Sequence, residues 1–188
     1  KINVMSKTIG PAMKERNAVL RSISEGFSSK ADLLPWDEQL IASGVKIIQK
    51  RLEFLFEIHG GITKRYSEIA GKKETLEVGY VSKIHEVLSE NEVLKYPYET
   101  DDPEGIFRKA LEKRLPQDIA AKVTSVGPHR DDIRFFLRGH DLEHFASRGE
   151  KRTLLLALKI TELEIVKTYI GQQPLLLLDD VFSELDND

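Results

Sequence analysis

The clearest hydrophobic pattern lies near the end of the chain, where an unbroken apolar run leads into acidic residues. The run Leu175–Leu178 follows Pro174 and precedes Asp179 and Asp180. Apolar residues without polar alternation predict a strand buried on both faces, as in a parallel sheet. Ligands of open α/β sheets bind beyond the carboxyl ends of the strands, where two carboxylates suit a hydrated Mg²⁺ and a nucleotide phosphate. This is the pattern of a Walker B strand, although a core strand followed by an acidic turn looks the same.

A helical pattern precedes this strand. Apolar side chains recur at helical spacing at Leu155, Leu156, Leu158, Ile160, Leu163, Ile165 and Ile170. They cover much of the circumference, so we expect this helix to be well buried. Ser147 is placed as its N-cap with Glu150 three residues later, a capping-box pattern, and Gly171 as its stop. A helix start with Ser147, Gly149 and basic neighbours is suited to bind an anion, although an ordinary capped helix has these features too.

The rest of the chain predicts further helices and short strands. Helices are expected at Pro11–Glu25, Pro35–Ala70, Lys83–Leu88 and Pro103–Leu115, strands at Thr75–Val81, Lys122–Val126 and Ile133–Leu137, a loop at Tyr96–Tyr98 and a turn at Arg138–Asp141. Pro11 is expected in the first turn of its helix and Gly26 just past its end. Gly60-Gly61 is expected to interrupt the second helical stretch. The first two stretches would form an antiparallel arm, with Phe27 and Trp36 in its core.

Composition limits the protein class only loosely. With 188 residues, the chain has room for one domain, or for one domain and a small second one. Hydrophobic residues make up 40% of it, which is enough for a core. It contains no cysteine, so disulfide and thiolate chemistry are excluded. No apolar run approaches a membrane span and no signal peptide is visible, so a cytoplasmic location is expected.

Charge is distributed unevenly along the chain. The formal net charge of −3 and a pI near 6.0 argue against a strongly basic nucleic-acid binder. However, Gly105–Arg152 contains 11 basic and 7 acidic residues, whereas Thr161–Asp188 contains 1 basic and 7 acidic residues. A basic middle and an acidic end fit phosphate contacts in one place and a Mg²⁺ site in another. A mixed, solvated surface would explain the same distribution.

Several short motifs narrow the reading to a family. These are Ala12–Asn17, Trp36-Asp37, Gly127–Asp132, and, after the apolar strand, the D-loop-like segment Ser183–Asp186. In this order, and from about Ala12 to Asp188, the chain resembles the bacterial RecF family. It departs from the family where Arg148 and Glu150 stand in place of the usual glutamines, and in residues 71–100.

The resemblance implies an α/β fold, namely the second half of an ABC/SMC-like P-loop ATPase head with an inserted antiparallel helical arm. Residues 1–115 would form the arm, or lid, with a connecting segment. Residues 116–188 would form the C-terminal part of the head, with its signature helix, Walker B strand and D-loop. The sequence contains no G-x-x-x-x-G-K-[ST] motif. We therefore expect the phosphate-binding loop in an N-terminal segment outside this chain, and no ATP hydrolysis by the chain alone.

The resemblance also implies roles for individual residues. Asp179 would hold Mg²⁺ through water, and Asp180 would activate the water that attacks the γ-phosphate. Four residues would contact ATP held by a second subunit: Ser147, Arg148, Gly149 and Glu150. Ser183 and Asp186 would lie at the dimer interface. Contacts with DNA or phosphate are expected from Arg130, Lys151 and Arg152.

At the level of the whole protein, the resemblance implies an ATPase with ATP and Mg²⁺ as cofactors. It would dimerise around ATP and bind DNA, with junctions between single-stranded and double-stranded DNA as expected sites. The implied processes are DNA repair, recombination, replication restart and the SOS response. RecR is the implied partner, and no membrane association is implied.

Other interpretations remain open at this point. One is another SMC-like or Rad50-like ATPase head. A second is an ATP-independent, Mg-dependent phosphohydrolase or nuclease, with a two-metal cluster of Asp131, Asp132, Asp179 and Asp180. A third is a partner-binding module that docks through the arm. For Asp131 and Asp132 we favour a structural role in their loop. His140 and His144 stand four residues apart, but a zinc site needs at least one more protein ligand.

Overall fold

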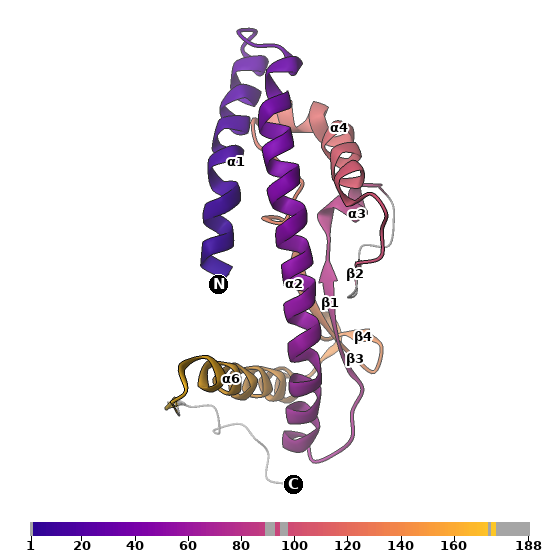
Figure 1. Cartoon of the computed structure of the whole chain (residues 1–188). Helices are drawn as coiled ribbons and strands as arrows, with labels where there is room; N and C mark the ends of the chain where they lie inside the picture. The colour runs from indigo at the N-terminus through magenta and orange to yellow at the C-terminus, as the bar shows by residue number, and fades with distance from the viewer. Residues whose placement is uncertain (1, 89–92, 95–97, 173, 176–188) are drawn as a thin grey trace. The chain divides into compact units, whose positions relative to one another are not determined.

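The computed structural model of the chain describes residues 2–88, 93–94, 98–172 and 174–175 (Figure 1). Its helices are α1 (Ile2–Ser24), the short 3₁₀ helix η1 (Lys30–Leu33), α2 (Leu34–Ile69), α3 (Lys83–Leu88), α4 (Pro103–Ala121), α5 (Leu142–Phe145) and α6 (Arg148–Ile170). Its strands are β1 (Leu76–Val81), β2 (Val93–Leu94), β3 (Asp132–Leu137) and β4 (His140–Asp141). The predictions for β1, α3 and β3 are confirmed to within one residue.

The chain forms two compact units, each built from two stretches of sequence. The first unit contains Lys1–Phe54 and Tyr80–Ile133, and the second contains Leu55–Gly79 and Arg134–Asp188. The chain passes between the units inside α2, β1 and β3. The expected division between residues 115 and 116 falls inside α4, and the assignment of 1–115 to an arm and 116–188 to a head stays a prediction.

In the first unit, α1 and the following part of α2 run in opposite directions and are joined through η1 (Figure 1). This is the predicted antiparallel helical pair. α4 packs against α1 and also against α3. The unit buries a continuous set of apolar side chains that includes Leu20, Leu33, Leu40, Ile41, Ile48, Ile84, Phe107, Ala110 and Leu111.

Both ends of α1 test a prediction. The helix begins at Ile2, so the prediction that Pro11 lies in the first turn is wrong. Pro11 is exposed inside the helix, where its ring removes one backbone hydrogen bond without ending the element. At the other end the prediction is confirmed, because Gly26 follows the helix with a left-handed φ of 82°.

The predicted break at Gly60-Gly61 is wrong, because α2 runs unbroken from Leu34 to Ile69. The second of these glycines allows a close approach instead. A Cβ at Gly61 would lie 3.2 Å from Cγ2 of Thr161 on α6. Each glycine lowers helix stability only by the low helix propensity of its residue type. The packing of α2 against α6 at Gly61 outweighs this cost.

The region after α4 differs from the sequence prediction. The helix continues past Leu115 to Ala121, through Pro116, and ends at Lys122 with a left-handed φ of 59°. The predicted strand Lys122–Val126 is a loop, and its N–H groups bond to α4 and to side chains rather than to a neighbouring strand. For example, the Thr124 N–H donates to Oδ1 of Asn17 at 2.8 Å.

Exposure corrects one further prediction. Phe27 is 82% exposed, so its predicted place in the core is wrong, whereas Trp36 is partly buried. Phe27 lies in the connection between α1 and η1. Throughout the described stretches, each helix is too short or too polar to cross a membrane.

The four strands form one sheet in the order β2-β1-β3-β4. The pairs β1–β2 and β3–β4 are antiparallel. Strands β3 and β4 are joined by the two-residue turn Arg138-Gly139, in which both residues have a left-handed φ, 54° and 81°. This conformation matches the twist of the two strands it connects. The predicted turn at Arg138–Asp141 is thus shorter than expected, because His140 and Asp141 pair with β3.

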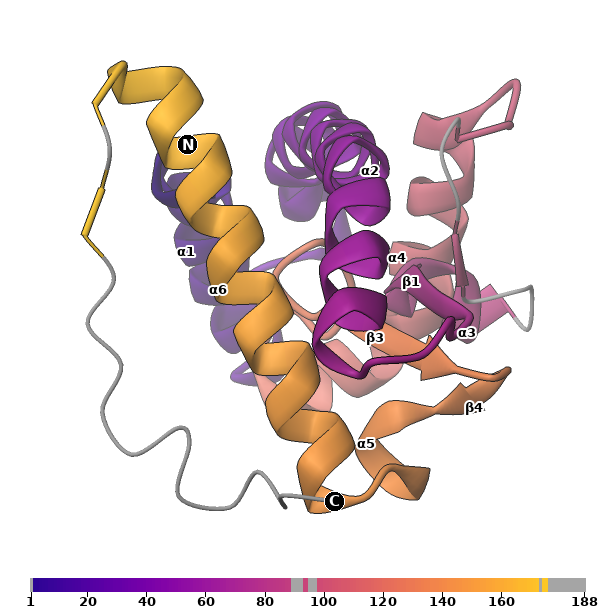
Figure 2. The ribbon, with the colours of Figure 1, turned by 90° about the horizontal axis from the view of Figure 1, so that it is seen from below.

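The second unit packs α6 along the C-terminal part of α2 (Figure 2). Its core joins both helices to the sheet and to α5, through Ile62, Tyr66, Leu76, Leu137, Leu142, Leu154 and Ala157. Arg65 of α2 pairs with Glu164 of α6. The predicted burial of α6 around much of its circumference is wrong: one face of its first half is buried, whereas Leu155, Tyr169 and Ile170 are mostly exposed.

Two glycines of α2 provide a test of packing. A Cβ at Gly44 would lie only 2.5 Å from Cε1 of the fully buried Phe107, whereas a Cβ at Gly60 meets nothing within 4 Å. We expect Gly44→Ala to lower the free energy of unfolding by roughly 1–3 kcal/mol through overpacking. The matched change Gly60→Ala should raise it by about 0.5–1 kcal/mol through helix propensity. Urea unfolding monitored by circular dichroism measures both, and equal effects of the two changes would contradict the packing argument.

Candidate functional site

Four of the predicted site residues cannot be placed. Asp179, Asp180, Ser183 and Asp186 lie outside the described residues. Of the predicted Walker B strand, Leu175 is described: it is not in a strand, and its side chain is 84% exposed. The roles of Asp179 with Mg²⁺, of Asp180 with the attacking water, and of Ser183 and Asp186 at the dimer interface therefore stay predictions.

The start of α6 has the predicted capping box. Oγ of Ser147 accepts a hydrogen bond from the Glu150 N–H at 3.2 Å, and Oε2 of Glu150 accepts one from the Ser147 N–H at 2.8 Å. At the other end, Gly171 follows the helix with a φ of 72°, as predicted for its stop. The 23 residues of α6 thus have the bounds that the sequence indicated.

This helix start can present hydrogen-bond donors to an anion. The N–H groups of Arg148 and Gly149 lie in the first turn, where a helix offers no carbonyl partner. Oγ of Ser147 accepts the bond from the Glu150 N–H, while its hydroxyl lies against the Glu150 carboxylate and could donate to an anion only by rotating away from it. A Cβ built on Gly149 would find Oγ of Ser147 at 4.0 Å as its nearest neighbour, so the backbone there is open to close approach. Donors in this arrangement, at the positive end of the helix dipole, suit a phosphate.

The carboxylate of Glu150 is engaged within the chain. One oxygen accepts from the Ser147 N–H, and the other accepts from Nη2 of Arg138 in the β3–β4 turn. The bond from the Ser147 N–H, together with Arg138, holds the pKa of Glu150 below its usual range. The predicted contact of Glu150 with ATP stays a prediction, but the structure gives this side chain two internal partners.

A hollow of about 290 Å³ lies beside the helix start. It is lined by Leu137, Arg138, His140, Asp141, Leu142, Phe145, Ala146 and Glu150. The rings of His140 and Phe145 are 5.6 Å apart. His140 is in β4 and His144 in α5, and the described part of the chain contains no cluster of three or more possible metal-ligating side chains.

The basic residues predicted to contact DNA or phosphate lie in different places. Arg130 is exposed, and its N–H donates to the Gly127 carbonyl at 2.8 Å. Lys151 is exposed near the start of α6, and its Nζ donates to the Glu143 carbonyl at 2.7 Å. Arg152 is partly buried. Arg130 belongs to the first unit and the two others belong to the second.

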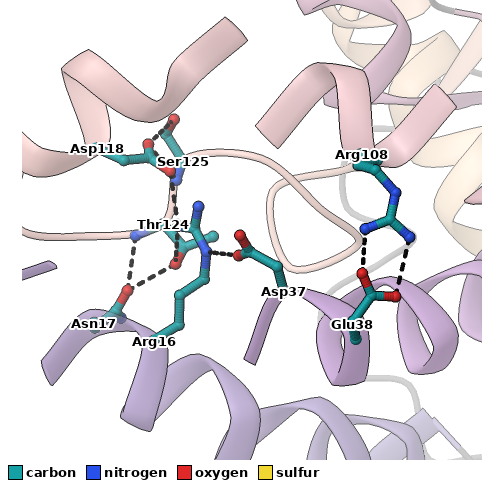
Figure 3. A network of polar contacts seen from close by, with 8 residues as sticks. All are labelled: Arg16, Asn17, Asp37, Glu38, Arg108, Asp118, Thr124 and Ser125. Atoms are coloured by element: carbon teal, nitrogen blue, oxygen red, sulfur yellow. Dashed lines mark hydrogen bonds and ion pairs between the residues drawn. The ribbon is translucent and has the colours of Figure 1, made fainter. Parts of the chain in front are cut away.

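In the first unit, a buried arginine holds four segments together (Figure 3). The side chain of Arg16 is fully buried. Its Nε donates to Oδ1 of Asp37 at 2.6 Å, and its Nη1 donates to Oδ2 of Asp118 at 2.9 Å. Nη1 also donates to Oγ1 of Thr124 at 2.9 Å, and that hydroxyl donates to Oδ1 of Asn17 at 2.7 Å. A charge buried to this degree is stable only with such partners.

This network explains three of the sequence motifs. Arg16 and Asn17 end the first motif, and Asp37 ends the second. The third joins through His129, whose Nε2 lies 3.1 Å from the Thr124 carbonyl and must therefore donate to it. Burial lowers the pKa of His129 and raises the pKa of Asp37. Motifs far apart in sequence thus meet in one structural cluster. Sequence reasoning missed its acceptor Asp118, because residues 102 positions apart leave no spacing signal.

The Gly127–Asp132 motif has a second buried contact. Asp131 accepts from the Tyr80 hydroxyl at 2.7 Å and from the Lys83 N–H at 2.8 Å. Arg51 donates to the Tyr80 oxygen at 3.1 Å. Burial raises the pKa of Asp131 to about 6, although the bonds from Tyr80 and Lys83 oppose the shift. Asp131 thus has a structural role, as favoured, but its partners are Tyr80 and Lys83 rather than groups of its own loop.

Known proteins with similar sequences indicate which kind of protein this chain comes from. No protein-family model matches the chain. The DNA replication and repair protein RecF of Lachnoclostridium phytofermentans is 37% identical over 174 residues, which cover 93% of this chain and 43% of the relative. RecF of Geotalea uraniireducens is 39% identical over 176 residues, covering 94% and 44%. The chain thus spans a little under half the length of the curated relatives it matches.

Two solved structures share the fold. One is described as the recombination mediator protein RecF-ATP in the RecFOR pathway, with a TM-score of 0.82 and 33% identity over 98% of this chain and 47% of the other. The second, described as RecF-ATPrS in the same pathway, has a TM-score of 0.81 over 97% and 47%. The fold is therefore that of part of an ABC/SMC-like ATPase with a helical arm. Over the stretch that it covers, the chain is similar to RecF proteins in both sequence and fold.

Removal of the buried arginine tests the network. We expect Arg16→Met to lower the free energy of unfolding by about 3–5 kcal/mol, because Asp118 would keep a fully buried charge without its cation. The matched control is Arg108→Met. Arg108 pairs with the exposed Glu38 in the same unit, with one contact at 3.0 Å (Figure 3). Surface pairs contribute little, so the control should unfold at nearly the same urea concentration as the parent.

Asp131 gives a prediction of pH dependence. In the folded chain it binds a proton below about pH 6, whereas in the unfolded chain it does so only near its ordinary value of 3.8. Between these values the folded state holds more protons, so the stability contribution of Asp131 falls as pH rises from 4 to 6. We expect the difference in free energy of unfolding between the parent and Asp131→Asn to shift by roughly 1–3 kcal/mol in this window. Urea titrations at several pH values check it. The exposed neighbour Asp132→Asn should show no such shift, and a flat profile for Asp131 would refute the assignment.

Proposed function

We propose that this chain is part of a RecF-type ATPase that acts in DNA repair, recombination and replication restart. The phosphate-binding loop of that ATPase would lie outside these 188 residues. In this proposal the start of α6 contacts the γ-phosphate of ATP held by a second subunit, so that nucleotide binding closes a dimer. ATP would thereby act as a switch between separate and paired subunits.

The observation that carries the proposal is the set of donors at the start of α6. Ser147, held by its capping box, and the amides of Arg148 and Gly149 form a phosphate-binding arrangement at the end of a 23-residue helix. The same fold occurs in RecF structures described as containing ATP or ATPrS. Ser147 caps the helix through its oxygen, and its hydroxyl can rotate from the Glu150 carboxylate to a phosphate, so its structural and functional roles are compatible.

The remaining parts of the reaction follow from the sequence pattern. Asp179 would hold Mg²⁺ through water, and Asp180 would orient the water that attacks the γ-phosphate. When bound, Mg²⁺ would neutralise charge on the phosphates. Ser183 and Asp186 would lie between the subunits.

DNA and RecR are the proposed macromolecular partners, with junctions of single-stranded and double-stranded DNA as the expected sites. The description of the similar structures as part of the RecFOR pathway supports this. Of the basic residues proposed to contact DNA, Arg130 and Lys151 are exposed and Arg152 is partly buried. A cytoplasmic location and a role in the SOS response stay predictions.

Substitutions of Ser147 in the full-length gene product test the proposal. Aspartate is a good N-cap, so Ser147→Asp should keep the helix start intact while it places a negative charge against the phosphate. We expect this variant to unfold within about 1 kcal/mol of the parent and to lose dimerisation induced by MgATP. Ser147→Thr keeps both the cap and the hydroxyl and should still dimerise. Light scattering after size-exclusion chromatography, with and without MgATP, reads out the assembly. MgATP-dependent dimers of Ser147→Asp would disprove the role of this segment.

A further inference from the structure

The start of α6 contains a charge that opposes anion binding. The carboxylate of Glu150 lies in the same first turn as the donors of Ser147 and Gly149. It cannot move away freely, because Oε2 of Glu150 accepts from the Ser147 N–H and completes the capping box. A triphosphate at this site would therefore meet a fixed negative charge. That charge weakens the binding of a phosphate unless a bonded cation offsets it.

Arg138 supplies this cation. Its Nη2 bonds to Oε1 of Glu150, the oxygen that the capping box leaves over. Its position is also held from the backbone side, since the Arg138 N–H donates to the Thr75 carbonyl at 2.9 Å. The residue has a left-handed φ of 54°, which costs energy for a side chain of this type. Glycine or asparagine would fill this turn position with less strain, so the guanidinium itself requires an explanation.

Other charged side chains lie near this turn, among them the exposed Arg148 at the start of α6, but Arg138 is the cation that bonds to the Glu150 carboxylate. Glu74 also lies 3.8 Å from Arg138, but Glu74 pairs more closely with Lys72, at 2.9 Å. Lys151 follows Glu150 directly, and its Nζ donates to the Glu143 carbonyl. Within the described stretches, the Glu150 carboxylate bonds to Ser147 and Arg138.

We propose that Arg138 is a positioning residue that offsets the charge of Glu150, so that the segment Ser147–Gly149 can accept the triphosphate of ATP. This inference rests on the proposed function and deepens it. Arg138 acts through Glu150 and needs no contact with the nucleotide. A side chain of the β3–β4 turn thereby sets the electrostatic potential at the start of α6, within one compact unit.

A double-mutant cycle in the full-length gene product separates this role from simple structural support. The variants are Arg138→Gln, Glu150→Gln and the double variant. The measurements are the MgATP concentration that gives half-maximal dimerisation and the urea midpoint of unfolding without nucleotide. Arg65→Gln is the matched control, because Arg65 also pairs with α6, at Glu164. That pair lies 14 residues beyond Glu150, or about 21 Å along the helix at a rise of 1.5 Å per residue.

The expected result is specific to charge. Arg138→Gln should raise the half-maximal MgATP concentration roughly three- to tenfold, the size expected for a unit charge near a phosphate in a partly solvated site. Glu150→Gln should lower it, because the opposing charge is removed while glutamine can still accept the Ser147 bond. The double variant should match Glu150→Gln to within about twofold, and 0.5 M salt should shrink the effect of Arg138→Gln. Arg65→Gln should behave as the parent.

Two results would overturn the inference. An unchanged MgATP requirement in Arg138→Gln would show that the charge of Glu150 needs no offset. An equal loss in Arg138→Gln and in the double variant would show that Arg138 touches the nucleotide or only supports the fold. Comparison with Ser147→Asp keeps the two proposals apart. If Ser147→Asp abolishes dimerisation while Arg138→Gln does not weaken it, this inference alone fails. If neither has an effect, the proposed function fails as well.

Discussion

The buried guanidinium of Arg16 is the contact that organises the first unit. A fully buried cation must be matched by acceptors, and those acceptors come from α2, from α4 and from the loop that follows α4. Through Arg16 the register of α1 is coupled to Asp37 and Asp118. The loop after α4 thereby becomes a fixed support for His129 and for the Gly127–Asp132 motif.

A comparable arrangement, smaller and more exposed, organises the start of α6 in the second unit. The capping box determines where the helix begins, and the Arg138–Glu150 pair ties that start to the turn between β3 and β4. Because α6 packs along α2 through Gly61 and Thr161, its first turn rests on a defined core. The site that we propose for ATP is therefore positioned by packing and capping, and its charge is adjusted by one side chain of the sheet.

The similarity to RecF proteins and the internal contacts answer different questions. The comparisons show which proteins this stretch is similar to, over a little under half of their length. The contacts show why the motifs consist of these residues. Arg16 and Asp37 bond to one another, and Asp131 bonds to Tyr80 and Lys83, so all of these serve the fold. The N–H groups of Arg148 and Gly149 have no carbonyl partner within the helix, so the start of α6 is where a binding role is best assigned.

The sequence by itself determined the local features. Periodicity and capping residues located α6, α3, β1 and β3 closely, because their signals come from residues within a few positions of each other. Prediction from the sequence failed where contacts between residues far apart in the chain determine the local structure. Gly60-Gly61 stays helical because α6 packs beside it, and Lys122–Val126 is a loop because Asn17 and Asp118 take up its N–H groups. The partners of Arg16 and of Glu150 were likewise decided by the tertiary structure. A charged side chain reveals that it needs a counter-charge, but only folding brings that counter-charge within reach.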